Sequence, residues 1–299
     1  MSIPSPIAPE FLLFVQHGWA DDNRAMLSLA QHLVTDTTPI IAPDLGFLET
    51  WIRITPLIAG VEAIALQQFT RYPDVPIRIV GHSMGGLIWL EVLSRHPEWW
   101  SKVHSLVLVA SPVGGADLGR LIDPLNLGIG IAGDLGRNRT ALAVAIAASI
   151  PTLMIAGDSD GGSDGIVPVV CTRFANAQFV CLSGIAHAAM RTHPKVIATI
   201  HEFWTGTANY EVVAADDMIQ RLRAVPGMTD GHWRDFNRAT IAMHLNTGGT
   251  LRVWINPLGI PHVFLASPGG ECLYAGFVGW LHTNDLHQAL ADIRQVYGT

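Results

Sequence analysis

Residues 77–86 read IRIVGHSMGG, and this stretch decides how the rest of the chain is interpreted. It begins as an apolar run and ends in glycines that open a helical pattern. The segment GHSMG at 81–85 has the spacing G-x-S-x-G, with Ser83 at its centre. A serine hydroxyl attacks well when a sharp strand-to-helix turn exposes it to a base. Flanking glycines remove side chains that would clash at such a turn, and the helix that follows directs its free N–H groups at a developing oxyanion.

The alternative interpretation of 77–86 is a glycine-rich turn between a strand and a helix, with an incidental serine. On the GHSMGG residues, however, the chain resembles the α/β-hydrolase superfamily, and within it the small lipases and esterases. The resemblance covers roughly residues 10–206 and does not cover the rest of the chain. It implies an α/β fold with a mostly parallel sheet of about six strands, and a catalytic triad that includes Ser83.

Composition narrows the possible functions. The 299 residues, 49% of them hydrophobic and 14% charged, suffice for one large domain or for one medium and one small domain. The net charge is −7 and lysine and arginine form no cluster, so we expect no nucleic-acid-binding face. The N-terminal residues MSIPSPIAPE lack a basic region before an apolar core, so we expect no signal peptide.

The uncharged stretch at 141–157 is slightly short for a bilayer span, and Pro151 divides it. We therefore expect a buried helix leading to a buried strand, and no transmembrane segment. Cys171, Cys181 and Cys272 are too few and too scattered for a disulfide framework or a metal site. A reducing cytoplasm fits this pattern best, although a Cys171–Cys181 pair stays open.

Apolar runs alternate with helical patterns through the first two thirds of the chain. This alternation predicts βαβ units and a parallel sheet. We expect Pro56 to break the long helical stretch at 48–72. The predicted strands are 11–16, 38–44, 77–82, 103–110, 151–156 and 177–182, and the predicted helices include 21–34, 48–72 and 85–95.

The first predicted strand ends in His17-Gly18-Trp19. In the family that the chain resembles, the residue after His-Gly supplies one backbone N–H of the oxyanion hole. The resemblance assigns that role to Trp19 and the second N–H to Met84, directly after the nucleophile. It makes His17 a structural residue of the loop, not the catalytic base.

A triad acid must lie in the loop after the strand at 151–156, within reach of the histidine. Three aspartates compete for this role. Asp164 stands in DGIVP and matches the family's D-G-x-V pattern, whereas Asp160 lies at a more usual distance from the strand and stays the alternative. Asp158 is expected to be a turn or capping residue. The closely spaced carboxylates would also suit a hard cation such as Ca²⁺, but the full calcium-loop spacing is absent.

His187 lies in a loop of small residues after the last predicted strand, as a general base requires. The order Ser83, Asp164, His187 is the one that α/β-hydrolases use. His193 and His201 fall in or near the next helix and are expected to be structural. We expect His82 to be a packing residue.

Residues 117–150 interrupt the alternation and are rich in glycine and small apolar residues. In the superfamily, inserts at this point form a cap over the active site. The functional interpretation is therefore a lid and acyl-binding wall. The alternative is an ordinary crossover helix with a loop.

After residue 206 the pattern changes, and we divide the chain into a catalytic domain at 1–207 and a C-terminal module at 208–299. The module is predicted to be a small antiparallel α+β unit, with helices at 211–223 and 284–297 and strands at 239–244, 251–255, 261–266 and 271–279. It resembles no family known to us. It could bind substrate, mediate self-association or dock a partner, and its histidines form no metal-ligand pattern.

These observations predict a serine ester hydrolase of the carboxylesterase or lipase type, with Ser83, Asp164 and His187 as the triad and Trp19 and Met84 at the oxyanion hole. The expected substrate is a small-molecule ester with an apolar part, and no metal or organic cofactor is needed. The same triad would serve a thioesterase, a lactonase or an acyltransferase. A non-catalytic binding scaffold is the alternative from a different class.

Overall fold

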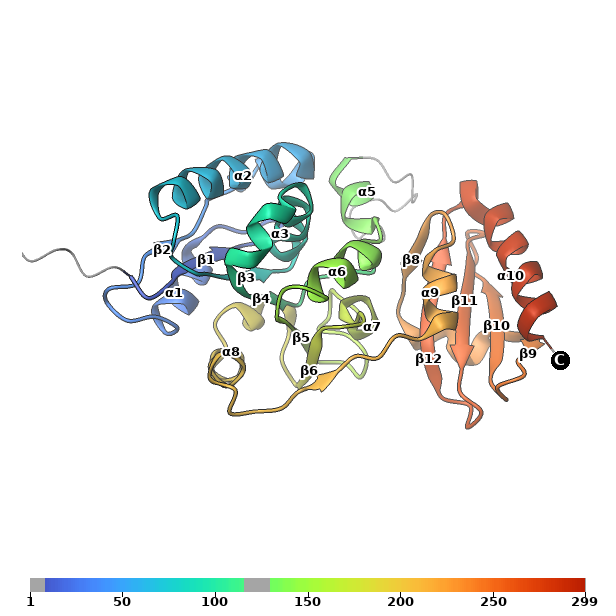
Figure 1. Ribbon diagram of the computed structural model, residues 1–299. Coiled ribbons are helices and arrows are strands. Elements are labelled where there is room, and N and C mark those ends of the chain that lie inside the picture. The colour runs from blue at the N-terminus through green and yellow to red at the C-terminus, as the bar shows by residue number, and fades with distance from the viewer. Residues whose placement is uncertain (1–8, 116–129, 299) are drawn as a thin grey trace, which may run out of the picture.

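The protein contains two β-sheets that lie beside each other (Figure 1). This computed structural model describes residues 9–115 and 130–298. The first sheet has seven strands in the order β2-β1-β3-β4-β5-β6-β7, and the second has five in the order β8-β12-β11-β10-β9. The expected α/β architecture with an additional antiparallel sheet is therefore confirmed.

Neighbouring strands of the first sheet are parallel, except for the last pair. A two-residue strand, β7, pairs antiparallel with β6 at the edge and accounts for the one strand beyond the six expected. The central strands β1, β3, β4 and β5 read as nearly continuous apolar runs and are mostly buried, as is typical of strands covered on both faces. The strands are β1 (Leu12–Gln16), β2 (Ile40–Ile41), β3 (Ile77–His82), β4 (Val103–Val109), β5 (Thr152–Asp158), β6 (Gln178–Ser183) and β7 (Glu211–Val212).

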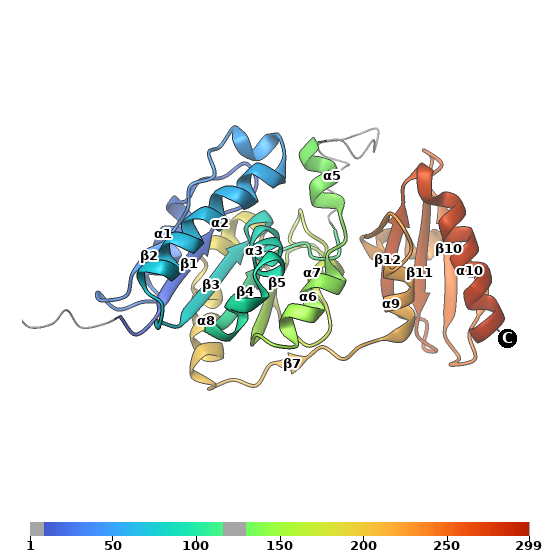
Figure 2. The same cartoon turned by 45° about the horizontal axis from the view of Figure 1, so that its top comes forward.

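Helices cover both faces of this sheet (Figure 2). On one face the buried residues of α2 (Ile54–Arg71), α3 (Met84–Arg95) and α6 (Thr140–Ala147) form one apolar cluster with the strands. On the other face α1 (Arg24–Gln31) and α8 (Pro194–Thr205) form a second cluster. The result is a three-layer arrangement in which the carboxyl ends of the parallel strands share one edge.

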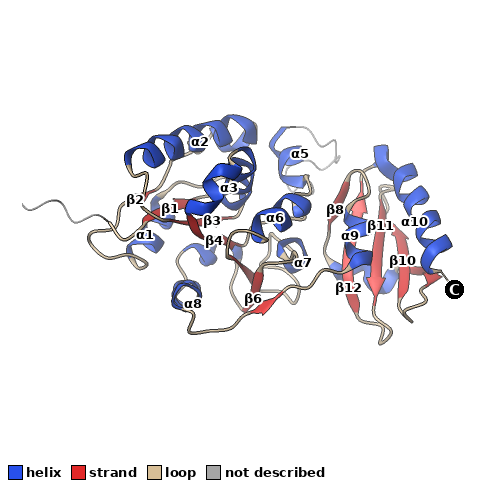
Figure 3. Ribbon diagram, viewed as in Figure 1, coloured by secondary structure: helices blue, strands red, loops and turns tan. Residues whose placement is uncertain are grey.

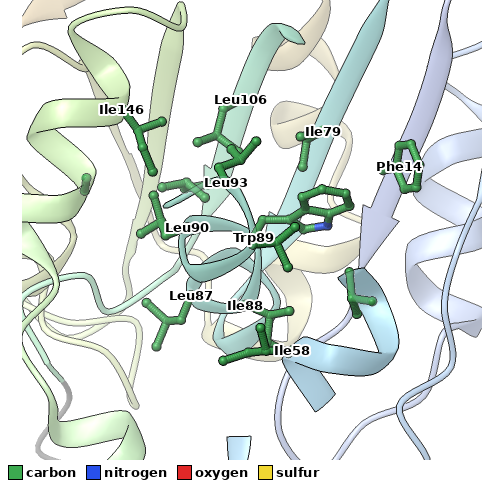
Figure 4. Close-up of a cluster of buried hydrophobic side chains, with 14 of the residues drawn as sticks. Phe14, Ile58, Ile79, Leu87, Ile88, Trp89, Leu90, Leu93, Leu106 and Ile146 are labelled. Carbon is green, nitrogen blue, oxygen red and sulfur yellow. The ribbon is translucent and has the colours of Figure 1, made fainter. Parts of the chain in front are cut away.

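Trp89 lies at the centre of the larger cluster (Figure 4). Its indole is fully buried and meets the ring of Phe14 edge-on, with centroids 5.0 Å apart. Helix α3 is buried almost all round, as the sequence predicts, and each fully buried large apolar side chain contributes about 1.5–3 kcal/mol. This packing fixes the position of α3, which begins at Met84, directly after Ser83.

Two predicted helices differ from the structure. Pro56 does not break a helix, because α2 begins at Ile54 and Pro56 stands in its first turn, where a missing N–H has no intrahelical partner to lose. A short 3₁₀ helix, η1 (Glu49–Trp51), precedes it. The prediction of one helix over 211–223 is also wrong, since Glu211–Val212 is strand β7 and the helix α9 covers only Asp217–Arg223.

The predicted cap at 117–150 lies partly outside the described residues, which resume at Gly130. Its described part forms α5 (Gly130–Gly136) and α6, the second of which leads to β5 as expected. The carboxylate of Asp134 on α5 accepts hydrogen bonds from the Arg53 guanidinium and the Ile54 N–H. These bonds hold α5 against the beginning of α2.

The second sheet is wholly antiparallel (Figure 3). Helices α9 and α10 (Thr283–Tyr297) pack on one of its faces through a shared apolar cluster. The rings of Phe236 and Phe264 meet on the other face. The sequence did not predict β8, which is three residues long. The strands are β8 (Met228–Asp230), β9 (Thr240–His244), β10 (Thr250–Ile255), β11 (Pro261–Ala266) and β12 (Cys272–Val278).

Within residues 9–115 and 130–298, no helix combines the length and the apolar character needed to cross a membrane.

Candidate active site

Ser83 lies between the last residue of β3 and the first residue of α3, where the chain turns sharply. Its backbone has φ 54° and ψ −126°, a conformation that non-glycine residues rarely adopt. The Ser83 N–H donates to the carbonyl of Val109 on the neighbouring strand at 2.8 Å. The hydrogen bond to β4 thus stabilises the strained backbone conformation of Ser83 at this turn.

The glycines around Ser83 are required by close backbone contacts. A Cβ at Gly85 would lie 2.3 Å from the carbonyl oxygen of Gln16, at the end of β1. A Cβ at Gly81 would lie 2.6 Å from the Cα of Gly86, in the helix that follows. Neither neighbour can move independently because both are backbone, so the G-x-S-x-G pattern follows from steric contact.

Gly18 brings the His-Gly-Trp loop against the same turn. A Cβ at Gly18 would lie 2.9 Å from the Cβ of Ser83 and 3.2 Å from the backbone N of Met84. Trp19, the next residue, therefore begins beside the nucleophile. Met84, expected to supply one oxyanion N–H group, thus lies beside Gly18, and Trp19, expected to supply the other, directly follows Gly18 in the chain. Helix α3 directs its positive dipole end to the same place.

The imidazole of His187 reaches both of its expected partners. Its Nε2 lies 3.0 Å from the Oγ of Ser83, and its Nδ1 lies 2.7 Å from Oδ2 of Asp164. A neutral ring that donates from Nδ1 to the carboxylate leaves Nε2 free to accept from the serine hydroxyl. All three side chains are buried, with residue exposures of 7% for Ser83, 2% for Asp164 and 9% for His187.

Asp164 is held by its own loop. Its Oδ1 accepts the N–H groups of Ile166 and Val167 at 3.0 and 2.7 Å, while Oδ2 faces the imidazole. The carbonyl of Asp164 also accepts the backbone N–H of His187 at 2.9 Å. Asp164 and His187 are thus joined by both side chain and backbone, and the carboxylate has no freedom to rotate away without breaking these bonds.

The other two aspartates of this loop have different partners. Asp158 accepts the N–H groups of Gly161 and Gly162 through Oδ1, which is the turn-capping role expected from the sequence. Asp160 accepts from the N–H and the hydroxyl of Ser163, and the hydroxyl bond lowers the pKa of Asp160. The structure brings Asp164, and not Asp160, to His187.

His82 does more than pack, contrary to the expectation from the sequence. It is buried, its ring centroid lies 4.7 Å from that of His187, and its Nε2 donates to the backbone carbonyl of His187 at 3.2 Å. Burial lowers the pKa of His82 well below its usual value, and the positive charge of Arg191 lowers it further. A neutral His82 therefore fixes the main chain that carries the base.

His17 is a structural residue, as the resemblance implies. The Leu45 N–H donates to its Nε2 at 3.0 Å, so Nδ1 carries the proton and donates to the carbonyl of Gly18. Burial lowers the pKa of His17, which keeps the ring neutral. Both nitrogens of His17 are occupied by the backbone, and the ring stabilises the loop that leads to Trp19.

The remaining histidines and the cysteines take no part in this site. His193 caps the beginning of α8, and His201 contacts the carbonyl of His32. Cys171, Cys181 and Cys272 form no disulfide with one another, so the Cys171–Cys181 pair left open by the sequence is not formed. Across the described ranges, no group of three or more His, Cys, Asp or Glu side chains is placed to hold a metal ion.

The comparisons with solved structures concern the fold. Lipase BlEst2 of Bacillus licheniformis in its propeptide form superimposes with a TM-score of 0.54, covering 93% of this chain and 70% of that one at 14% identity. Est1E of Butyrivibrio proteoclasticus with ferulic acid bound superimposes with a TM-score of 0.51, covering 67% of this chain and 90% of that one at 15% identity. The chain has the α/β-hydrolase fold. Its parallel sheet and its serine between β3 and α3 agree with this assignment.

Sequence comparison finds similarity to esterases over a shorter span of the chain. Pimeloyl-(acyl-carrier protein) methyl ester esterases of Neisseria meningitidis are similar, the first being 35% identical over 112 residues, which make up 37% of this chain and 39% of that enzyme. A second is 34% identical over the same length. The chain thus spans about two fifths of the length of the curated relatives it matches. No protein-family model matches the sequence.

Proposed function

We propose that the protein is a serine hydrolase that cleaves carboxylic esters through an acyl-enzyme. The observation that carries this proposal is the pair of contacts at His187, one to the Ser83 hydroxyl at 3.0 Å and one to the Asp164 carboxylate at 2.7 Å. A nucleophile, a base and a group that orients the base are the three parts that acyl transfer requires. The similarity to named esterases supports the same reaction class.

In the first half-reaction, the Oγ of Ser83 attacks the ester carbonyl carbon while Nε2 of His187 takes the hydroxyl proton. The carbonyl oxygen becomes an oxyanion beside the backbone N–H groups of Trp19 and Met84. Asp164 balances the charge of the imidazolium and preserves the tautomer in which Nε2 accepts a proton. Collapse of the tetrahedral intermediate breaks the bond to the alcohol, which leaves with the proton from His187.

In the second half-reaction, a water molecule gives a proton to Nε2 of His187 and attacks the acyl carbon. The intermediate collapses to the free acid, and the proton returns from His187 to the Oγ of Ser83. Each oxyanion donor of such a site contributes about 3–4 kcal/mol to the barrier reduction. No step requires a metal or an organic cofactor.

We infer that the substrate carries an apolar acyl or alcohol part. Side chains at 47–52 expose large apolar surface beside the His-Gly-Trp loop: Phe47 is 52% exposed, Leu48 73% and Ile52 65%. Trp51 in the same segment packs its ring against Trp19, with centroids 4.3 Å apart. Exposed apolar surface beside the loop that carries Trp19 favours a hydrocarbon group over a charged one.

We also infer that residues 1–207 form the catalytic domain and 208–299 a C-terminal module, with the described part of 117–150 contributing to the cap. Residues 211–212 still pair with the first sheet, so the physical passage to the second sheet lies just after them. The three cysteines form no disulfide with one another, which supports the further proposal that the protein works in a reducing cytoplasm.

Hydrolysis of p-nitrophenyl acetate, butyrate and octanoate, together with an acyl thioester, tests the proposed function. We expect wild-type turnover on the esters, and a fall in kcat on the order of 10⁵- to 10⁶-fold in Ser83→Ala. Ser94→Ala is the matched control, because Ser94 lies on α3 with its hydroxyl bonded to the carbonyl of Glu91. A Ser83→Ala protein as active as Ser94→Ala would refute the proposal, and faster thioester cleavage would redirect it to a thioesterase.

A further inference from the structure

The loop that carries Asp164 is a narrow hairpin with a defined base. Residues 158–168, here called the acid loop, bring Ser163 and Pro168 together as an isolated β-bridge. The Asp164 N–H donates to the carbonyl of Val167, so Asp164 stands at the tip. At the base, the Val169 N–H donates to the carbonyl of Gly162. The backbone of Asp164 is therefore connected to the base of the loop by these hydrogen bonds.

The short helix α7 (Val169–Thr172) continues from this base, and an arginine of the C-terminal module holds its far end. Nη2 of Arg223, on α9, donates to the carbonyls of Val170 and Arg173 at 3.2 and 3.0 Å. These carbonyls belong to the last turn of α7, where a cation interacts favourably with the helix dipole. The C-terminal module thus binds α7, the helix that follows the acid loop.

Asp230, on strand β8, fixes the guanidinium of Arg223. Nε of Arg223 donates to both carboxylate oxygens at 3.2 and 3.0 Å, and the Tyr274 hydroxyl donates to Oδ1 at 2.8 Å. The side chain of Asp230 is fully buried. A bidentate pair between a carboxylate and a guanidinium has a defined geometry, so it sets the orientation of Arg223 toward α7.

The backbone of Asp230 joins the same place to the first sheet. Its N–H donates to the carbonyl of Gly114, in the loop after β4, and its carbonyl accepts from the thiol of Cys171 on α7. A Cβ at Gly114 would lie 2.0 Å from Oδ2 of Asp230. The contact between the two sheets is therefore close-fitting, polar and centred on one residue of β8.

A second contact covers the base of the acid loop itself. A Cβ at Gly162 would lie 2.3 Å from Nε1 of Trp233 and 3.0 Å from Cε1 of His232. Nε2 of His232 lies 3.9 Å from Oδ1 of Asp160 in the same loop. The module therefore contacts the loop base at Gly162 from outside while Arg223 holds α7.

We propose that the C-terminal module is a positioning element for the catalytic acid, with Arg223 and Asp230 as its positioning residues. A buried ion pair gives little net stability, because desolvation of the two charges offsets their attraction, but it imposes a fixed geometry. Acyl transfer is sensitive to such geometry, since a misplacement of 1 Å can cost about 10²-fold in rate. This inference rests on the proposed ester hydrolysis at Ser83, and it gives the module a role in turnover instead of in substrate capture.

The test uses the full-length chain with both charges removed together, Arg223→Met with Asp230→Asn, so that no charge is left buried alone. Far-UV circular dichroism and the unfolding midpoint show that the variant is folded. We expect kcat on p-nitrophenyl butyrate to fall by about 10- to 100-fold with KM within twofold of wild type. We also expect faster hydrogen–deuterium exchange in a peptide that covers 158–168. Arg221→Met, on the same helix but in an exposed pair with Asp217, should change neither quantity.

A double variant with wild-type kcat and unchanged exchange at 158–168 would overturn the proposal, as would a rise in KM with unchanged kcat. If the double variant does not fold, Trp233→Ala decides the question, because the Trp233 side chain lies on the surface with 46% exposure. In Trp233→Ala we expect kcat to fall a few-fold and hydrogen–deuterium exchange at 158–168 to become faster. If neither quantity changes, the proposal is overturned. Absence of ester hydrolysis by the wild-type protein would instead refute the proposed function, and the exchange result would still report whether the module holds the loop.

Discussion

The loops at the edge of the seven-stranded sheet and the loops that join the two sheets are held in different ways. At the catalytic edge, backbone meets backbone: Gly18, Gly81 and Gly85 leave no room for a side chain, and the positions follow from steric contact. Between the sheets, a buried side chain provides contacts: Arg223, which is paired with Asp230 inside the C-terminal module, donates to main-chain carbonyls of the first part of the chain. Steric contact at the catalytic edge requires glycines at fixed positions and so produces a short sequence motif. An ion pair such as Arg223 with Asp230 requires only two charged residues, and no sequence motif marks it.

This difference predicts where substitutions act on chemistry and where they act on geometry or stability. Changes at the catalytic edge should remove turnover from a folded protein. Changes in the exposed apolar segment 47–52 should alter substrate preference. Changes at the buried His82 should alter how the free energy of unfolding depends on pH.

Asp164→Asn should reduce kcat by about 10⁴-fold in a protein that still folds. The amide oxygen can keep the N–H bonds of Ile166 and Val167, but its NH₂ group then faces Nδ1 of His187. The imidazole must accept at Nδ1 and carry its proton on Nε2, where it cannot take the proton of Ser83. Steady-state turnover of p-nitrophenyl butyrate measures the effect.

Asp160→Asn is the matched control for this prediction, because it makes the same change in the same loop. Asp160 accepts hydrogen bonds from Ser163 and does not contact His187, so the kcat of Asp160→Asn should stay within tenfold of wild type. A collapse of turnover in Asp160→Asn, with Asp164→Asn still active, would reverse our assignment of the acid.

Much of the fold and of the site could be predicted from the sequence, for a physical reason. Strands buried on both faces must be apolar, and a turn that exposes Ser83 must have glycines beside it, so β3, α3 and the order of Ser83, Asp164 and His187 can be recognised from local patterns. The choice of Asp164 over Asp160 rested on a family pattern, and the hydrogen bonds of the loop now give its structural basis.

Other features could not be predicted because they depend on contacts between distant parts of the chain. The bond from His82 to the carbonyl of His187 joins residues 105 positions apart. The polar His82 at the end of an apolar strand was the one local signal for it. Strand β8 is three residues long and forms only because β12 offers it an edge, and β7 forms in the same way beside β6.

Trp51→Ala should lower kcat/KM for p-nitrophenyl octanoate by about tenfold and leave that for the acetate nearly unchanged. Removing the ring takes away the apolar surface that packs on Trp19, worth roughly 1–3 kcal/mol for a longer acyl chain. Trp280→Ala is the control, because Trp280 follows strand β12 of the second sheet and is similarly exposed. The exposed fraction is 43% for Trp51 and 49% for Trp280. Equal losses on both esters would show that Trp51 supports the fold and does not select the acyl chain.

The stability of the protein should fall as the pH drops below about 6.5, in part because His82 is buried in its neutral form. Its pKa is lowered in the folded state, so between the usual value of 6.5 and the lower folded value the unfolded chain binds the extra proton. Each such group can contribute up to about 1.4 kcal/mol per pH unit in this window. Stability is fully present above the window and decreases through it.

Chemical denaturation from pH 7.5 to pH 5 measures this slope. His82→Gln should be less stable than wild type at pH 7.5 but lose less stability on acidification. His287→Gln removes an exposed imidazole on α10 and should keep the wild-type slope. Identical slopes in wild type and His82→Gln would show that His82 has no part in the acid sensitivity.

The most direct test of the central claim, that Ser83 is activated by His187, is covalent capture of the serine. Wild type, Ser83→Ala and His187→Ala are incubated with a fluorophosphonate, and the adduct is mapped by peptide mass spectrometry. We predict one adduct on Ser83 in wild type, none in Ser83→Ala, and much slower labelling in His187→Ala. An unlabelled wild-type protein, or a label that Ser83→Ala retains, would contradict the account.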